Sequence, residues 1–231
     1  VPLIMDNTAA PVICKPLEHG AAIVLHSLTK FIGGHGTSIG GIVVDGGNFD
    51  WIKDRKRQPL LNEPDQSYGG AIWSDVVPQL TGANIPFVIR LRVVLLRDTG
   101  SPLAPFNAWQ IIQGLETVGL RMKQHCANAE KVVSFLETQK KVTNVIYPTN
   151  HQGEIKERAK KYLKGGNGAL VGADLGTAEA GAKFIDNLKM LYHVANIGDA
   201  RSLAIHPATT THSQLNEKEL LAAGVTPGYV R

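Results

Sequence analysis

The sequence has few cysteines, few aromatic side chains and no long hydrophobic run. Its two cysteines, Cys14 and Cys126, are far apart and belong to no paired motif. This content excludes a disulfide scaffold and favours a reducing compartment, so we expect a cytoplasmic protein. The longest apolar runs, such as 21–25 and 93–96, are far shorter than the ~20 residues that span a bilayer, and we expect no membrane insertion.

Charge is also sparse and nearly balanced. Lysine and arginine number 24 against 20 acidic residues, which gives a net charge of +4. The one basic cluster, at 53–57, includes an acidic residue, and the other basic residues are scattered. We therefore expect no nucleic-acid partner. A hydrophobic fraction of 43% is typical of a folded domain and excludes disorder or a coiled coil.

Short apolar runs separated by glycine and proline predict an α/β fold in the first third. The pattern indicates a buried parallel sheet with helices on both faces, with strands at 3–7, 22–25 and 41–44. A short helix at 15–20 should end at Gly20. Residues 45 to about 100 are expected to form surface helices and loops. Because the chain opens inside a strand-like run, we expect it to be a fragment.

The second half is predicted to be a smaller α+β unit joined to a long helix over 105–136. We expect strands at 142–147 and 169–174 and helices at 152–163 and 178–191. Cys126 should lie in the core on or near the apolar face of the long helix. That face has apolar residues at steps of three, four or seven: Ile111, Leu115, Val118, Met122, Ala129, Val133 and Leu136.

Residues 25–41 carry most of the chemical information. A strand should deliver Ser27, Thr29 and Lys30 to its C-terminal edge, where open α/β sheets bind ligands, and a glycine-rich loop follows. The two hydroxyls could hold a phosphate while a desolvated lysine acts as a nucleophile. A solvated lysine beside a simple turn is the alternative, because a lone glycine-rich loop is weak evidence. A nucleotide-binding loop is disfavoured, since its lysine would follow the glycines.

Asp6 ends the first predicted strand, and one helix and one further strand connect it to Lys30. Both residues can therefore reach the same sheet edge. A carboxylate in apolar surroundings needs a cationic partner, and a pyridinium nitrogen would serve; otherwise Asp6 caps a helix. His206 and His212 lack a third ligand, so we expect no metal site.

These segments resemble the Cys/Met-metabolism family of pyridoxal-phosphate enzymes, which includes cystathionine synthases and lyases, methionine γ-lyase and the O-acetylhomoserine sulfhydrylases. The resemblance implies fold type I, the aspartate-aminotransferase-like class. Residues 1–118 would be the later part of the large cofactor domain, and 119–231 the small C-terminal domain. The matching motifs lie at residues 5–8, 15–20, 26–36, 103–108, 114–117, 120–122, 125–129, 196–203, 206–208, 211–212 and 224–231.

The resemblance also implies a role for each site residue. Lys30 would form the Schiff base with pyridoxal phosphate and act as the general acid and base. Asp6 would pair with the pyridine nitrogen, Thr8 would lie by the ring, and Ser27 and Thr29 would bind the phosphate. Arg231 would grip the substrate α-carboxylate, because a guanidinium fork donates two parallel bonds. Asn196 would lie near that carboxylate, with a simple turn residue as the alternative.

Residues 196–203 are similar to the O-acetylhomoserine sulfhydrylase branch of the family. Relatives that act as γ-lyases or cystathionine synthases instead tend to carry serine in place of Asn196. The implied reaction converts O-acetyl-L-homoserine and sulfide, or a thiol, to L-homocysteine and acetate in methionine biosynthesis. A γ-lyase, a cystathionine γ-synthase or a non-catalytic assembly module are the alternatives, with a nucleotide-binding domain less favoured.

The resemblance implies a homo-oligomer, a dimer or tetramer with shared active sites, and it leaves a sulfur-carrier protein possible. Two departures stand out. Residues 7–11 lack the aromatic residue and one further position usual in the family, and nothing matches the family's upstream half, which provides the phosphate nest and a stacking tyrosine.

Overall fold

The computed structural model describes residues 1–231, and these fold into two compact units. The first unit contains Val1–Thr8, Lys15–Ser27 and Gly40–Trp109, and the second contains Ala9–Cys14, Leu28–Ile39 and Gln110–Arg231. The last boundary between the two units lies between Trp109 and Gln110, within the long helix α5 (Pro105–Glu137). The predicted boundary at residue 118 lies further along the same helix. The assignment of 1–118 and 119–231 to two domains of the family fold stays a prediction.

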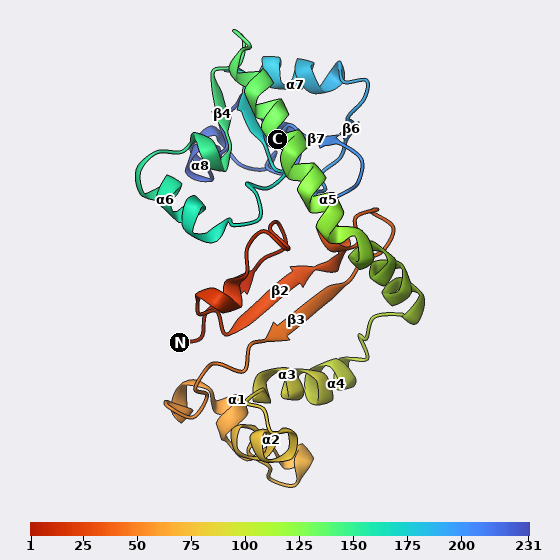
Figure 1. Cartoon of the computed structure of the whole chain (residues 1–231), viewed down its shortest axis with the longest axis vertical. Helices are drawn as coiled ribbons and strands as arrows, with labels where there is room; N and C mark the ends of the chain where they lie inside the picture. Colours follow the sequence, from red (N-terminus) through yellow and green to blue (C-terminus); the bar gives the residue numbers. More distant parts are fainter. The chain divides into compact units, whose positions relative to one another are not determined.

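Three strands form the sheet of the first unit, at the positions that the sequence predicts: β1 (Ile4–Asp6), β2 (Ile23–Ser27) and β3 (Gly41–Asp45) (Figure 1). The strand order is β1-β2-β3, with β1 and β2 parallel. A short 3-10 helix, Pro16–His19, connects β1 and β2 and ends at Gly20, whose φ of 89° lies in the left-handed region. This confirms the predicted helix and its glycine stop.

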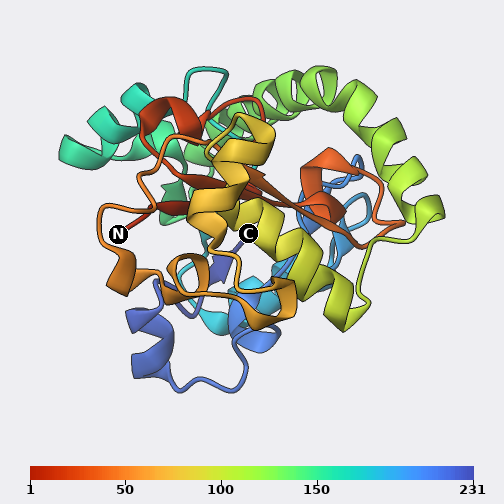
Figure 2. The same ribbon diagram turned by 90° about the horizontal axis from the view of Figure 1, so that it is seen from below.

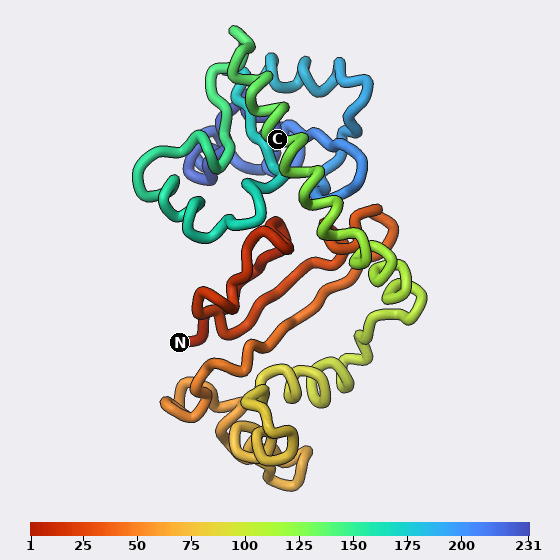
Figure 3. Tube along the Cα trace, viewed as in Figure 1, coloured from red at the N-terminus to blue at the C-terminus, as the bar shows by residue number.

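The expectation of an all-parallel, buried sheet is wrong for β3. Strand β3 runs antiparallel to β2, with Ser27 opposite Gly41 and Ile23 opposite Asp45. A parallel pair needs a crossover, usually a helix, but residues 28–40 form a turn and a glycine loop, so the chain reverses and returns beside β2 (Figure 3). The three residues of β1 are also exposed. Apolar runs alone do not encode strand direction, which is why the sequence misled here.

Residues 45–100 contain a hydrophobic core rather than only surface helices and loops. Trp51, Leu61, Trp73 and Val77 are buried against Ala22 and Ile23 at β2, and Trp51 stacks on Phe87 at 5.7 Å between ring centroids. Figure 2 shows α2 and α3 side by side. The helices are α1 (Pro59–Asn62), α2 (Trp73–Thr81), α3 (Pro86–Arg90) and α4 (Arg97–Thr99), with 3-10 turns at Arg55–Arg57 and Gln66–Tyr68 and a π-helical segment at Leu91–Leu96.

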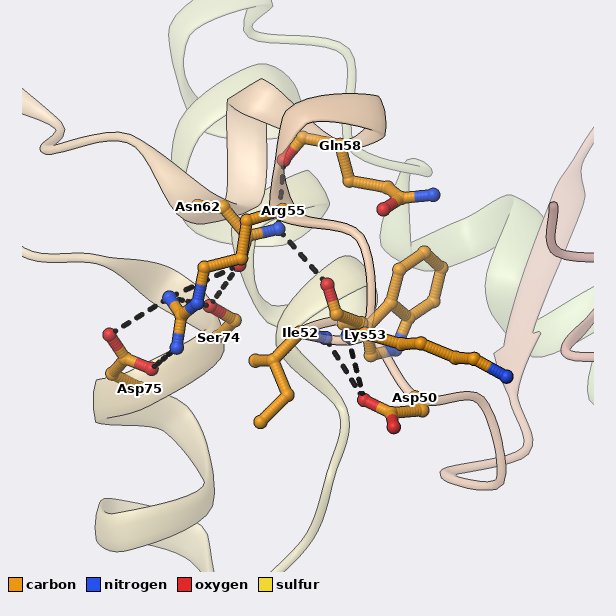
Figure 4. A network of polar contacts seen from close by, with 9 residues as sticks. Asp50, Ile52, Lys53, Arg55, Gln58, Asn62, Ser74 and Asp75 are labelled. Atoms are coloured by element: carbon orange, nitrogen blue, oxygen red, sulfur yellow. Dashed lines mark hydrogen bonds and ion pairs between the residues drawn. The ribbon is translucent and has the colours of Figure 1, made fainter.

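A polar network ties the basic cluster to α1 and α2 (Figure 4). The guanidinium of Arg55 donates to both carboxylate oxygens of Asp75, at 2.6 and 3.2 Å, and to the side chains of Asn62 and Ser74. The Asn62 amide in turn donates to the carbonyl of Trp51 at 3.1 Å. These contacts satisfy the buried side chains of Asn62 and Ser74 at the border of the tryptophan core.

The second unit is α+β, as predicted. Strands β4 (Asn144–Ile146), β5 (Gly172–Asp174) and β8 (Tyr229–Val230) form an antiparallel sheet, and β6 (Tyr192–His193) pairs in parallel with β7 (Leu203–Ala204). Helix α7 ends at Asp186 rather than near 191. The helices are α6 (Gly153–Tyr162), α7 (Ala178–Asp186) and α8 (Glu217–Ala222), with 3-10 turns at Pro148–Asn150 and Pro207–Thr209.

The buried face of α5 follows the predicted spacing except at Leu115 and at Leu136, which is only half-buried. Cys126 is 5% exposed, which confirms it as a core residue, but Leu115 is 50% exposed. Gly114 occupies that place on the face, because the helix approaches the backbone of Gly33 so closely that a Cβ would overlap its carbonyl oxygen. The buried positions of the face are Ile111, Gly114, Val118, Met122, Cys126, Ala129 and Val133.

Membrane-spanning character is absent from each helix taken singly. Only the bent pair of Trp73–Thr81 and Pro86–Thr99 reaches the required length and apolar composition when the two are counted together.

A pair of alanine substitutions tests the close approach of α5 at Gly114 to the backbone of Gly33. Gly114→Ala should destabilise the protein by about 1–3 kcal/mol, because the new Cβ must displace the Gly33 backbone. Gly119→Ala, on the same helix with open space around it, should instead stabilise the protein by about 0.5–1 kcal/mol. Urea unfolding followed by circular dichroism measures both, and equal effects of the two substitutions would contradict the packing.

Candidate functional site

Three predicted site residues meet at the C-terminal ends of β1 and β2. The backbone N–H of Thr8 donates to the Asp6 carboxylate at 2.9 Å, and the backbone N–H of Ser27 donates to the Thr8 hydroxyl at 2.8 Å. Hydrogen bonds from the side chain and backbone of Thr8 lower the pKa of Asp6. Asp6 therefore forms a turn with Thr8 and caps no helix, and its exposed carboxylate is ionised at neutral pH.

His26 is a neighbour of Asp6 that the sequence reading passed over. Its ring is half-buried, and its Nδ1 atom is buried without a hydrogen-bond partner. Burial lowers the pKa of His26, while the charge of Asp6 raises it; the net direction is downward. His26 is thus a neutral imidazole beside an ionised carboxylate.

Lys30 lies in a π-helical turn, Leu28–Ile32, that directly follows β2. Its backbone angles, φ −92° and ψ −127°, interrupt the helical geometry of the turn. Leu28, Phe31 and Ile32 are buried, whereas Lys30 is half-buried and its Nζ donates to the side-chain oxygen of Asn196. Lys30 forms no ion pair with a carboxylate. The turn therefore presents a primary amine held by a neutral acceptor.

Thr29 lies in the same turn. It lines a small hollow together with Gly33, His35 and Ser38 of the glycine loop. Thr29 and Lys30 therefore lie in one turn of the second unit, and this turn directly follows Ser27 in the chain.

Asn196 and Arg231 are in contact with each other. The guanidinium of Arg231 donates to the backbone carbonyl of Asn196 at 3.1 Å, and both residues line a cavity of about 470 Å³ with mostly apolar walls. Paired backbone hydrogen bonds between Arg231 and Ile205, at 2.9 and 3.0 Å, fix the position of the arginine. Lys30, Asn196 and Arg231, predicted from separate motifs, thus form one connected group.

The loop after Asn196 packs against the lysine turn. Gly198 has a φ of 76°, and a side chain there would overlap the backbone of Lys30 and Phe31. The carboxylate of Asp199 is buried and accepts from the Arg201 guanidinium at 2.8 Å, and this hydrogen bond holds the pKa of Asp199 below its usual value. Asp199 and Arg201 were not singled out from the sequence, although their motif was.

The two histidines near the C-terminus have structural contacts. His206 is buried, and its two ring nitrogens contact the Thr209 hydroxyl at 2.9 Å and the Pro227 carbonyl at 2.7 Å. His212 contacts the Thr211 hydroxyl. No group of three metal-ligating side chains occurs in the chain.

Comparison with known proteins decides the family. The Cys/Met metabolism PLP-dependent enzyme family matches residues 1–231. The chain belongs to this family. It is 51% identical over 237 residues to O-acetyl-L-homoserine sulfhydrylase of Leptospira meyeri and 43% identical over 235 residues to homocysteine synthase of Schizosaccharomyces pombe. In both cases all of this chain and 53% of the relative are covered, so the chain spans about half the length of the curated relatives it matches.

A solved structure extends the similarity to the fold. An O-acetylhomoserine (thiol)-lyase from Campylobacter jejuni, solved with N'-pyridoxyl-lysine-5'-monophosphate, is 37% identical and gives a TM-score of 0.88. The alignment covers 100% of this chain and 54% of that one. This confirms the fold type I class for the chain, and the family that matches the chain is one of PLP-dependent enzymes.

The residues present fit that cofactor chemically. An amine that no carboxylate neutralises suits covalent attachment of an aldehyde, and an ionised carboxylate at a strand end suits a pyridinium nitrogen. The hydroxyls of Ser27 and Thr29 can donate to a phosphate.

His125 on α5 is, like His26, a half-buried histidine. Its ring packs edge-on against Phe31 at 5.8 Å, and its Nε2 atom is buried without a hydrogen-bond partner. Burial is the main cause that lowers its pKa, and Arg121 adds to the effect while Asp199 opposes it. His125 is therefore neutral in the folded protein.

The depressed pKa values of His26 and His125 predict acid sensitivity. Both side chains bind protons more readily in the unfolded chain, where the pKa is about 6.5, so the free energy of unfolding should fall as the pH drops through that value. His125→Gln should reduce the slope between pH 7 and pH 5, because glutamine does not titrate. Urea unfolding at several pH values measures this. A stability that is constant over this range, or an unchanged slope in the variant, would contradict the assignment.

Proposed function

We propose that the chain provides the lysine-bearing half of a pyridoxal-phosphate enzyme that converts O-acetyl-L-homoserine and sulfide, or a thiol, to L-homocysteine and acetate. The observation that carries the proposal is the connected group of Lys30, Asn196 and Arg231, which links an amine to a carboxylate-binding guanidinium. Two similar proteins, the O-acetyl-L-homoserine sulfhydrylase at 51% identity and the O-acetylhomoserine (thiol)-lyase at 37%, support this substrate class. The reaction would serve methionine biosynthesis.

The chain's own residues would hold the cofactor. Lys30 would bind it covalently through Nζ, and Asp6 would accept a hydrogen bond from the pyridine nitrogen. Thr8 would lie by the ring, and Ser27 and Thr29 would bind the phosphate. The Thr8 hydroxyl already links the ends of β1 and β2 through the N–H of Ser27, which supports neighbouring roles for Thr8 and Ser27.

Arg231 and Asn196 would orient the substrate. A guanidinium donates two parallel hydrogen bonds to a carboxylate, and the cavity beside Arg231 and Asn196, at about 470 Å³, has the size of a small-molecule site. Its mostly apolar walls would exclude water from the chain of carbon atoms between the carboxylate and the acetyl group. Asn196 would also accept from Lys30 whenever the amine is free.

The bound cofactor would supply an electron sink for negative charge that develops at the substrate α-carbon. Lys30 would be the general base and acid, since its amine would remove a proton from the α-carbon and then from the β-carbon and return both. Asp6 would stabilise positive charge at the ring nitrogen throughout. In the overall exchange the Cγ–O bond to acetate breaks and a Cγ–S bond forms.

The wider setting of the enzyme follows from the same family. We propose a homo-oligomer, a dimer or tetramer with shared active sites, that uses free sulfide, a thiol or a sulfur-carrier protein as donor. Both cysteines are free thiols, which supports a cytoplasmic location.

Borohydride trapping tests the covalent role of Lys30. The complete polypeptide that contains residues 1–231 is incubated with pyridoxal phosphate, reduced and mapped by mass spectrometry. We expect a visible absorption band and a pyridoxyl adduct on Lys30, both lost in Lys30→Ala and kept in Lys123→Ala, an exposed lysine of α5. A label spread over surface lysines would overturn the proposal.

Substitutions at the substrate group test the reaction. Arg231→Lys should raise the KM for O-acetylhomoserine by about tenfold or more, because one bidentate contact is lost. Arg158→Lys, on the exposed face of α6, is the control. Homocysteine and acetate should be the products with sulfide. Release of an α-keto acid and ammonia instead, or consumption of cysteine, would identify a γ-lyase or a cystathionine synthase.

A further inference from the structure

Arg121 has an unusual set of partners. It lies on α5 in a half-buried position, and its guanidinium donates to three backbone carbonyls: Phe31 at 2.6 Å, Ile32 at 2.9 Å and Gly114 at 2.7 Å. Its Nε atom donates to the Thr117 hydroxyl at 3.1 Å. No carboxylate forms an ion pair with it. Each of the three guanidinium nitrogens therefore donates to a neutral oxygen atom.

This arrangement costs free energy that a surface arginine avoids. Burial of a guanidinium without a counter-charge is unfavourable, and burial lowers the pKa of Arg121. Its hydrogen bonds go to backbone carbonyls of two segments and to one hydroxyl, so the side chain fits one local arrangement of backbone. The position and acceptors of Arg121 are thus specific to the backbone that it contacts.

Two of its acceptors directly follow Lys30. Within the turn, Gly33 donates to the Leu28 carbonyl at 2.9 Å and Gly34 donates to the Lys30 carbonyl at 2.8 Å. The carbonyls of Phe31 and Ile32 are the ones that Arg121 satisfies. Buried carbonyls need a hydrogen-bond partner, so the turn depends on this side chain.

The orientation of Lys30 depends on those same peptide groups. The backbone angles of Lys30 leave the helical region, so its side chain does not follow the direction of a continuing helix. Ala200 holds the next part of the loop by donating to the Gly34 carbonyl at 2.8 Å. Arg121 thus holds the two peptide carbonyls that lie between the Lys30 carbonyl and this second anchor.

We propose that Arg121 is a positioning residue, which fixes the direction of the Lys30 side chain by holding the carbonyls of Phe31 and Ile32. The inference rests on the proposed role of Lys30 as the cofactor lysine. It adds a residue that touches neither cofactor nor substrate and acts through the turn.

The test compares Arg121→Met with Arg158→Met, a substitution of an exposed arginine on α6, in the complete polypeptide. The first readout is hydrogen–deuterium exchange of residues 28–36. The second is the rate at which pyridoxal phosphate attaches to Lys30, measured by borohydride quenching over time. In Arg121→Met we expect hydrogen exchange of the turn to become about 10- to 100-fold faster and attachment of pyridoxal phosphate to Lys30 to become slower by a similar factor. We also expect kcat to fall by a similar factor while KM stays nearly unchanged. Arg158→Met should match the parent protein.

Two milder variants keep the test decisive if Arg121→Met does not fold. Thr117→Val removes the contact to Nε and the hydroxyl's own hydrogen bond to the Gly114 carbonyl but keeps the guanidinium contacts to the turn, and we expect a smaller change of the same kind. Arg121→Lys keeps the charge but has no fork, so it should restore part of the attachment rate. Values equal to those of Arg158→Met in every variant that folds would overturn the proposal.

The design separates this inference from the proposed function. If pyridoxal phosphate never labels Lys30 in the parent protein, the proposed function fails. The exchange comparison still reports whether Arg121 orders the turn, and unchanged exchange would overturn the positioning role by itself.

Discussion

The turn that carries Lys30 depends on hydrogen bonds to backbone carbonyls that no regular helix or strand satisfies. Arg121 supplies these bonds from α5, and Gly114 allows the helix to come close enough for the side chain to reach them. On the other side Gly198 permits a similar approach by the loop that carries Asn196. The lysine amine and its acceptor are therefore set by three segments that lie far apart in the sequence, and a change in any of them should alter the direction of the amine.

The first unit contributes a different kind of order. Its parallel pair of strands ends at Asp6, Thr8 and Ser27, which are joined by hydrogen bonds of 2.8 and 2.9 Å, so the carboxylate has a fixed place and a lowered pKa. The core around Trp51 and Trp73 stabilises β2 from one side. Rigid support of this kind is what a carboxylate needs if it is to hold a pyridinium nitrogen in one orientation.

The sequence predicted most helix and strand positions well, because they depend on local apolar periodicity. Lys30, its flanking hydroxyls and Asp6 were proposed from types of residue at fixed spacing, and their roles stay predictions. The sequence could not predict the reversal of β3, which depends on how residues 28–40 fold, or the exposure of Leu115, which depends on what α5 packs against. Arg121 has no local signal either: its acceptors at 31 and 32 are about ninety positions away, and an arginine in a helix is usually a surface residue.

A crystal structure of the complete polypeptide with pyridoxal phosphate tests the central claim most directly, since it shows the cofactor, the lysine and the turn together. The account predicts continuous electron density from the cofactor to Nζ of Lys30, with the Arg121 guanidinium on the carbonyls of Phe31 and Ile32. Density that joins the cofactor to another side chain would contradict the account, and so would an ordered Lys30 turn with Arg121 directed to solvent.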